Sequence, residues 1–517
     1  MRVQQKVIQC AELFKEVHKI VQSRSYIMTP EAFEMLADEY MADAQRREDE
    51  CGIEVERVLD EAKATYQRLR NDDMHLIYAV LEAISNHIKD LRSPGRVIYP
   101  MHIVLMVMLM ARCRNIKSSA EIANFYNGHN LVLQLLLPGM PSPSNFISEA
   151  TIKNVRSLIS EKESNRIFKE LFGAIHLATD QLITYNDAKY KDGREGLRTT
   201  VAFDGQEMKS TFVRGSKSRG KKAAIVVTVF DCSSRTAIDF KNTAVKNRER
   251  DAFIEMAQTI DLRGVVVMCD ALNSTAAVTN CITERGGDYL VPLKDNGGNK
   301  ELRNHIEAIF NREHKKTIKI TDAFKDHGRI EELTFEILPA EKYIDTRIKN
   351  SHKNVRTLVK YTKITDLEST DIRYYISSIP FEAGKDGLTL RQVRASILDY
   401  WFIESYHNVL DTSKLAQDRF QGCVPETLSL EASLNKIALN IITAERNRMS
   451  IARRKKTPIS FNDTMYRFSQ WSIYKLFTIV FCTYMSKDPV YTLIFNFFDQ
   501  ITSLTGNNLN FFLRPVI

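Results

Sequence analysis

The sequence of 517 residues lacks several features that mark specialised small or membrane-bound proteins. Its eight cysteines include no Cys-x-x-Cys pair, which excludes zinc-finger spacing and a compact disulfide framework. No run of about 18 uncharged apolar residues occurs, so we expect no transmembrane helix and no membrane partner. The first residues also lack the pattern of a signal peptide. Together these absences favour reduced cysteines and a cytoplasmic protein.

Positive charge is in small excess, because the sequence has 72 Lys and Arg and 64 Asp and Glu, for a formal net charge of +8. The distribution of charge is therefore more informative than the total. Residues 31–61 are strongly acidic, which is the wrong sign for contacts with DNA phosphates. The stretch "RGSKSRGKK" has the opposite character, and its cations are Arg214, Lys217, Arg219, Lys221 and Lys222. A flexible basic loop of this kind suits a nucleic-acid backbone, and a solvated surface hairpin is the alternative.

From residue 196 the sequence changes from helical patterns to short runs rich in Val, Ile and Ala. The runs "TTVAFDG", "AAIVVTVFDC", "RTAIDFKN", "GVVVMCDALN" and "DYLVPLK" read as strands, and helical pieces separate the later ones. This order predicts an α/β fold with a mixed sheet. Residues 306–384 alternate in the manner of further strands, and helices return at Thr389.

Three carboxylates are placed where such a sheet could bring them together. Asp204 and Asp270 each follow an apolar strand, and Glu404 lies on a predicted helix in "YWFIESYHNVLD". Three carboxylates at one sheet edge repel one another unless a cation lies between them. Two Mg²⁺ ions about 4 Å apart meet that need and serve in-line displacement at phosphorus. The alternative for the first site is a hairpin turn at Asp204 and Gly205, since Asp-Gly is a turn pair.

The ordered blocks of this sequence resemble a known family. "VAFDGQEMKSTFVRGSKSRGKKAAIVVTVF", "DLRGVVVMCDALN", "HGRIEELTFEI", "RYYISSI" and "YWFIESYHNVLDTSKLAQDRFQG" resemble, in this order, the catalytic blocks of DDE transposases of bacterial insertion sequences, in the H-repeat-associated branch. The stretch from 93 to 126 resembles the associated amino-terminal domain of that branch. The likeness covers about 84–448.

The resemblance implies a fold, a reaction and a set of site residues. The fold implied is a ribonuclease-H-like mixed sheet with a β-rich insertion, preceded by a helical amino-terminal region. Asp204, Asp270 and Glu404 would be the catalytic and metal-binding residues, with Mg²⁺ as cofactor and Mn²⁺ as a substitute. Further DNA contacts are implied at Lys294, Arg329 and His407. Two positions depart from the branch, since Gln206 stands where a lysine is common and Tyr400 where a histidine is usual.

The expected organisation has six segments. They are an acidic helical arm (1–80), a helical DNA-binding or associated domain (81–175), the first part of the catalytic core (196–305), the β-rich insertion (306–384), the second part of the core (385–450), and a basic then apolar tail (451–517). In the second segment, Ser118 and Glu121 match a capping box. Its short helices, one of which carries Lys153 and Arg156, are compatible with a helix-turn-helix DNA reader or with generic helical packing.

The function implied is cleavage of insertion-sequence ends and their joining to target DNA. Expected partners are double-stranded DNA, as terminal inverted repeats and target, and further copies of the chain in a homo-oligomer. A bacterial, nucleoid-associated location follows. Two alternatives stay open at this stage: a decayed or repurposed copy that binds DNA without cutting it, and a nuclease that cuts without joining. Trp401 could stack on a base, although a core position is the more common role for a helical tryptophan.

Overall fold

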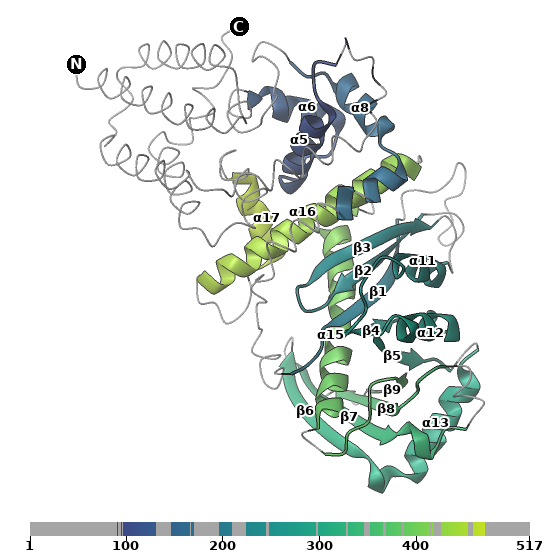
Figure 1. The fold of residues 1–517 in the computed structure, drawn as a ribbon. Helices are drawn as coiled ribbons and strands as arrows, with labels where there is room; N and C mark the ends of the chain where they lie inside the picture. Colours follow the sequence, from purple (N-terminus) through teal and green to yellow (C-terminus); the bar gives the residue numbers. More distant parts are fainter. Residues whose placement is uncertain are drawn as a thin grey trace, which may run out of the picture. The chain divides into compact units, whose positions relative to one another are not determined.

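The computed structural model describes the chain in segments that form two compact units (Figure 1). The described residues are 90, 92, 95, 97–130, 146–165, 167–169, 196–208, 224–243, 248–295, 298–326, 329–345, 352–365, 369–384, 387–413, 415–417, 425–452 and 459–470. The first unit takes its described residues from Met1–Leu182, Val424–Arg446 and Ile459–Ile517, and the second from Ile183–Cys423 and Asn447–Pro458. The acidic arm, the five cations of the basic loop and the apolar tail lie outside the described residues.

The first unit is helical, as the sequence predicts. Its described helices are α5 (Met101–Cys113), α6 (Ser119–Asn127), α8 (Glu149–Leu158), α17 (Phe461–Gln470) and most of α16 (Pro425–Ala452). Helix α5 is buried at every position except His102, in keeping with its apolar sequence. The predicted capping box is confirmed at α6, where the Ser118 hydroxyl accepts a 3.2 Å hydrogen bond from the Glu121 amide and the Glu121 carboxylate accepts one from the Ser118 amide.

A buried ion cluster ties α5 and α8 to α16 within this unit. The Glu431 carboxylate pairs with the guanidinium groups of both Arg112 and Arg156. Arg156 also donates a 2.9 Å hydrogen bond to the Ser119 hydroxyl. Burial lowers the pKa of each guanidinium to about 10, so both remain charged at neutral pH. Arg156 therefore points into the unit, and only Lys153 of the two cations expected on this helix is exposed.

The second unit is built on one nine-stranded mixed sheet, which confirms the predicted α/β class. Its strands are β1 (Thr200–Glu207), β2 (Ile225–Asp231), β3 (Thr236–Thr243), β4 (Val266–Cys269), β5 (Asp288–Leu293), β6 (Ile318–Asp326), β7 (Arg329–Pro339), β8 (Thr357–Thr365) and β9 (Thr370–Ser377). The sheet order is β3-β2-β1-β4-β5-β9-β8-β7-β6. The first three strands are antiparallel, and β1, β4 and β5 are parallel, which is the ribonuclease-H-like arrangement. Strands β6–β9 extend it as an antiparallel meander.

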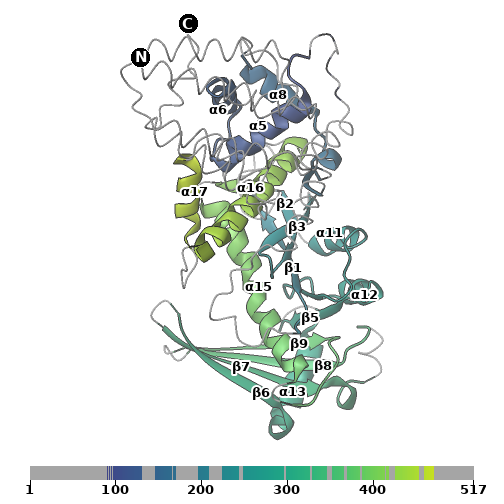
Figure 2. The same cartoon turned by 60° about the vertical axis from the view of Figure 1, so that its left-hand side comes forward.

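Helices cover both faces of this sheet (Figures 1 and 2). Helices α11 (Glu249–Met256), α12 (Ala276–Glu284) and α13 (Lys300–Arg312) pack on one face. There Phe203 of β1 stacks on Phe253 of α11 with ring centroids 3.9 Å apart. The long helix α15 (Leu388–Thr412) packs on the other face, where its apolar side chains meet those of β4, β5 and β7. Because side chains alternate along a strand, each β1 side chain lies either on the α11 face or on the α15 face of the sheet.

Strand β1 does not end where the sequence suggested. Asp204 was expected at a strand end, with a hairpin turn as the alternative, yet β1 continues through Glu207. Asp204 pairs with Thr228 and Gly205 with Val227 in the ladder with β2, so the hairpin alternative is wrong. A glycine suits this position inside the strand because the Glu249 side chain of α11 occupies the space that a Cβ would need.

Two further expectations concern the cysteines and the membrane. Among the described residues, Cys113, Cys232, Cys269 and Cys281 are free thiols. None of the helices in the described part of the chain combines the length and the apolar character that crossing a membrane would need.

Candidate active site

Asp204 and Asp270 lie side by side on neighbouring parallel strands. The register pairs Phe203 of β1 with Cys269 of β4, and the residues that follow these two are Asp204 and Asp270. Phe203 faces α11, and alternation turns Asp204 toward α15. Asp270 follows the last residue of β4, as predicted, and its Oδ1 accepts a 2.9 Å hydrogen bond from the amide of Asn273. The sheet thus presents two carboxylates at one level.

Glu404 is supplied by α15, which packs on β1 and β4. Burial raises the pKa of the Glu404 carboxyl, and the negative charge of Asp204 raises it further. The pKa of Asp270 is also raised, by burial first and then by Asp204, against a lowering effect of Lys294. Asp204 is therefore the common neighbour of the other two carboxylates. Tyr400, one turn before Glu404, has a pKa raised by burial and by all three carboxylates.

The donor set suits a hard divalent cation. Carboxylate oxygens are the ligands that Mg²⁺ prefers, and mutual repulsion of carboxylates is the electrostatic condition that a cation relieves. Within the described residues, no group of three or more His, Cys, Asp and Glu side chains is gathered closely enough to bind a single metal ion. The arrangement is thus two carboxylates, Asp270 and Glu404, whose pKa values are each raised by burial and further by the charge of Asp204.

A pocket of about 430 Å³ opens beside two of these carboxylates. It lies between the ends of β4 and β5, the strands β8 and β9, and α15. Besides Asp270 and Glu404, its polar and aromatic lining comprises Lys294, Asp295, Arg303, Tyr361, Arg373, Tyr375, Tyr400 and Trp401. Three cations and four aromatic rings therefore adjoin the carboxylates.

Arg373 and Trp401 form the outer wall of this pocket. The Arg373 guanidinium lies 5.5 Å from the Trp401 ring centroid and pairs with Asp371 through Nε at 2.9 Å and Nη2 at 2.8 Å. The Trp401 side chain is 41% exposed, so the core position favoured by the sequence is wrong. An exposed tryptophan under a cation, next to carboxylates, is a platform for a planar anionic ligand.

The remaining residues predicted to contact DNA are distributed as follows. Lys294 lines the pocket and is half-buried. Arg329 is the first residue of β7, and its side chain is outside the described atoms. His407 is only 8% exposed; its Nδ1 lies 3.3 Å from Asp204 Oδ2 and its Nε2 3.4 Å from the Thr228 hydroxyl. A DNA contact for His407 stays a prediction, and the contacts observed are with the protein.

Glu249 was not predicted and lies on the α11 side of the same strand ends. A Cβ on Gly205 would come within 2.5 Å of the Glu249 carboxylate. The Glu249 Oε2 accepts a 2.9 Å hydrogen bond from the Asn273 side chain. The backbone N–H of Asn273 in turn donates a hydrogen bond to the Asp270 carboxylate. The signal in the sequence was Gly205 itself, since a glycine inside a strand often marks a close approach of another group.

We expect Gly205→Ala to lower the free energy of unfolding by about 0.5–1.5 kcal/mol, because the new methyl group must displace the end of the Glu249 side chain and with it the hydrogen bond from Asn273. In a Glu249→Ala background the same substitution should cost less than about 0.5 kcal/mol, since the obstacle is gone. Urea denaturation of the four proteins of this double-mutant cycle measures the coupling. Equal costs in both backgrounds would show that Glu249 does not limit the space at Gly205.

The chain matches curated proteins over nearly their full length. "Putative transposase YncI" of Escherichia coli O157:H7 is 25% identical over 396 residues, covering 75% of this chain and 93% of the relative. "H repeat-associated putative transposase YhhI" of E. coli K12 is 24% identical over 390 residues, covering 72% and 94%. The resemblance to H-repeat-associated transposases is confirmed. No model of a known protein family matches the chain.

Among solved structures, a chain of a piggyBac transposase synaptic complex with hairpin DNA resembles this one, and the alignment covers 83% of this chain and 82% of the piggyBac chain. Its sequence identity is 10% and its TM-score is 0.36, which is too low to carry an argument.

Proposed function

We propose that the protein is a DNA transposase that cleaves the ends of an insertion sequence and joins them to target DNA by metal-dependent phosphoryl transfer. The observation that carries the proposal is the convergence of Asp204, Asp270 and Glu404 from two strands and a helix. Burial raises the pKa of both Asp270 and Glu404, and the like charge of Asp204 raises each further, a combination that is common at functional sites. The relatives named as transposases support the same reaction class.

Between them the three carboxylates would hold two Mg²⁺ ions, or Mn²⁺ in their place, with no single ion bound by all three side chains. When bound, the cation supplies charge neutralisation at the reacting phosphate and activation of the attacking oxygen. The chain contributes the rigid positions of Asp204 and Asp270 on paired strands, and an approach by Glu404 from α15. It also contributes the cations of the pocket, which are oriented before the substrate arrives: Arg373 by Asp371, and Arg303 by Glu307 at 2.8 Å.

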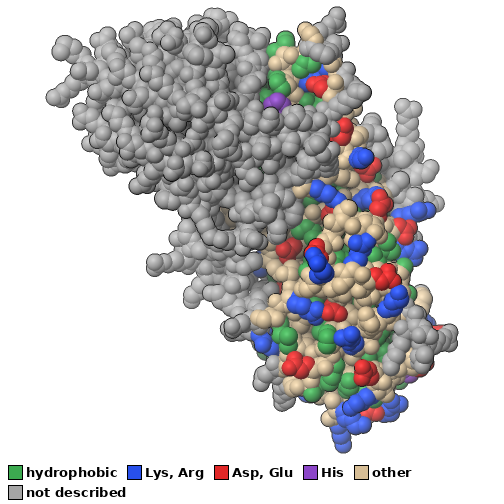
Figure 3. Space-filling model, in the orientation of Figure 1, with side chains coloured by type: hydrophobic (Ala, Val, Ile, Leu, Met, Phe, Trp, Pro, Cys, Tyr) green, Lys and Arg blue, Asp and Glu red, His purple; other side chains and the backbone are tan. Residues whose placement is uncertain are grey.

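The pocket would receive the DNA strand next to the reacting phosphate. Its volume of about 430 Å³ falls in the range of small-molecule sites and is far too small for a duplex. Lys294 and Arg373 supply positive charge for a phosphate, and Trp401 supplies an apolar face. On the face of the described residues shown in Figure 3, Lys and Arg are interspersed with Asp and Glu, so this pocket is a better-defined DNA contact than that surface.

The proposal is tested by incubating the full chain and Mg²⁺ with DNA that carries the sequences flanking its gene, together with a target plasmid. Nicks or breaks at the element ends followed by joined products are the expected result. Nicks without joined products would indicate a nuclease. Binding without any cut in Mg²⁺ or Mn²⁺ would indicate a DNA-binding protein that keeps the fold without the activity.

Arg373→Gln is expected to weaken DNA binding and to reduce the slope of log affinity against log salt by about 1, because one phosphate contact is lost. The chain has two tryptophans, so in a Trp471→Phe background Trp401 alone reports on the pocket. Titration with an oligonucleotide in EDTA should quench its emission in the wild type and quench it less in Arg373→Gln. Arg263→Gln is the control, since Arg263 is exposed and pairs with Asp261. An unchanged salt slope in Arg373→Gln would remove Arg373 from the DNA contacts.

A further inference from the structure

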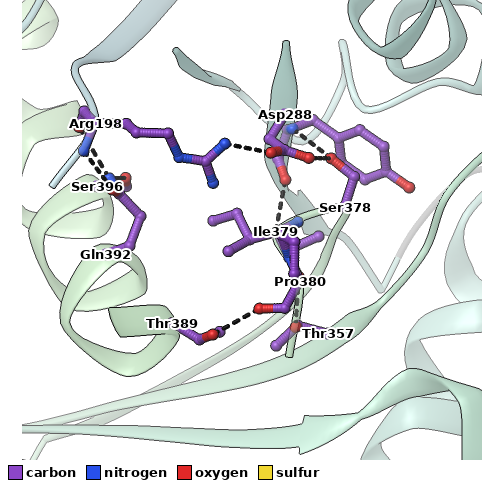
Figure 4. Close-up of polar contacts among 11 residues, drawn as sticks. Arg198, Asp288, Thr357, Ser378, Ile379, Pro380, Thr389, Gln392 and Ser396 are labelled. Atoms are coloured by element: carbon purple, nitrogen blue, oxygen red, sulfur yellow. Dashed lines mark hydrogen bonds and ion pairs between the residues drawn. The ribbon is translucent and has the colours of Figure 1, made fainter. Parts of the chain in front are cut away.

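Helix α15 runs along β1, and side chains attach the two elements at a series of points. Just before β1, the side-chain amide of Gln392 makes two hydrogen bonds with the backbone of Arg198 (Figure 4). Its Oε1 accepts from the Arg198 N–H at 2.7 Å, and its Nε2 donates to the Arg198 carbonyl at 3.1 Å. The hydroxyls of Thr200 and Ser396 follow, 2.9 Å apart. All of these contacts lie at the end of β1 away from the carboxylates.

The far end of β1 carries a second attachment through Gln206. Its Nε2 donates to the Asp411 carboxylate at 2.7 Å and to the His407 carbonyl at 3.2 Å. Its Oε1 accepts a 3.2 Å hydrogen bond from Gln417, in the segment after α15. Gln206 is buried, and every one of these partners is about 200 positions away along the chain. We call Gln206, His407, Asp411 and Gln417 the Gln206 brace.

The two attachments are separated by similar lengths of strand and of helix. From Arg198 to Gln206 a strand advances about 26 Å at ~3.3 Å per residue. From Gln392 to Asp411 a helix advances about 28 Å at ~1.5 Å per residue. A slip of α15 by one turn would move it by about 5.4 Å and break every bond of the brace.

The brace also reaches the first carboxylate. His407 Nδ1 lies 3.3 Å from Asp204 Oδ2, and the two form an ion pair when the imidazole is protonated. On the other side of the ring, Nε2 lies 3.4 Å from the Thr228 hydroxyl. One residue on α15 thereby orients Asp204, while Glu404 stands one turn earlier on the same helix.

We infer that Gln206 and His407 are positioning residues, which fix the level of Glu404 against Asp204 and hold Asp204 in the orientation in which it binds a divalent cation. The inference rests on the proposed function, because it assigns these residues to the metal-binding carboxylates.

The test is Mn²⁺ affinity of the full chain without DNA, measured by calorimetry. Gln206→Leu should weaken Mn²⁺ binding by about 10–100-fold, the usual cost of losing a residue that orients a metal ligand. Gln392→Leu is the matched control, because it removes a buried amide from the other end of the same helix and strand. It should lower stability comparably and leave Mn²⁺ affinity within about threefold.

The two proposals fail in different ways. Equal Mn²⁺ affinity of Gln206→Leu and the wild type would overturn the positioning role and leave the proposed function standing. A wild type that binds no Mn²⁺ would overturn both. Should Gln206→Leu not fold, the His407 variants decide: His407→Asn keeps a donor near the Nδ1 position and should retain affinity, whereas His407→Phe should lose about 10-fold. Equal affinities of these two variants would remove His407 from the brace.

Discussion

Replacing Asp204 with asparagine is expected to lower the rate of DNA strand cleavage by about 10³-fold or more while DNA affinity stays within about twofold. Asp204 is the carboxylate whose charge acts on both Asp270 and Glu404, so its removal takes away the shared member of the trio. An asparagine has the same shape as the aspartate and keeps its side chain beside His407. Cleavage is measured on labelled end DNA, and affinity on the same DNA in EDTA.

Asp261→Asn is the matched control for this experiment. Asp261 is exposed and pairs only with its neighbour Arg263 among the described residues, so the same change of charge there should leave both cleavage and affinity unaltered. Cleavage by Asp204→Asn at the wild-type rate would refute the catalytic assignment. Loss of DNA binding in parallel with cleavage would show that Asp204 acts in binding or folding rather than in the reaction.

The succession of strands and helices along the chain was predictable because each strand carries its own local signal. Runs such as Val266–Cys269 are short, apolar and followed by turn residues, and the helical pieces between them have a different period. Asp270 was correctly placed for this reason, since a strand that ends at Cys269 leaves the next residue at the edge of the sheet. Asp204 was placed at the right level for the wrong reason, because β1 continues past it.

The contacts that orient these carboxylates were not predictable from the sequence. Gln206 meets Asp411, and Gly205 meets Glu249, across the two faces of the sheet. No local pattern encodes such pairs, because they depend on which face α11 and α15 cover. Trp401 shows the same limit: a helical tryptophan is more often core, and only the position of β9 reveals that this one lines a pocket.

Loss of the Glu431 carboxylate should have the largest effect on stability of any single substitution considered. We expect Glu431→Gln to lower the free energy of unfolding of the first unit by about 3–5 kcal/mol. The reason is that Arg112 and Arg156 would remain charged and buried with no counter-ion in the cluster. Replacing an entire buried ion cluster by apolar residues can be neutral, but removing one member leaves an uncompensated charge.

Hydrogen exchange of peptides from α5 and α8 is the measurement, because it reports on this unit separately from the nine-stranded sheet. Opening of these helices should become more frequent by about two to four orders of magnitude in Glu431→Gln. The matched control is Glu149→Gln on α8, which breaks an exposed pair with Lys153 and should cost less than about 0.5 kcal/mol. Similar protection in both variants would mean that the arginines find other acceptors, and that the cluster is not what holds α5 and α8 to α16.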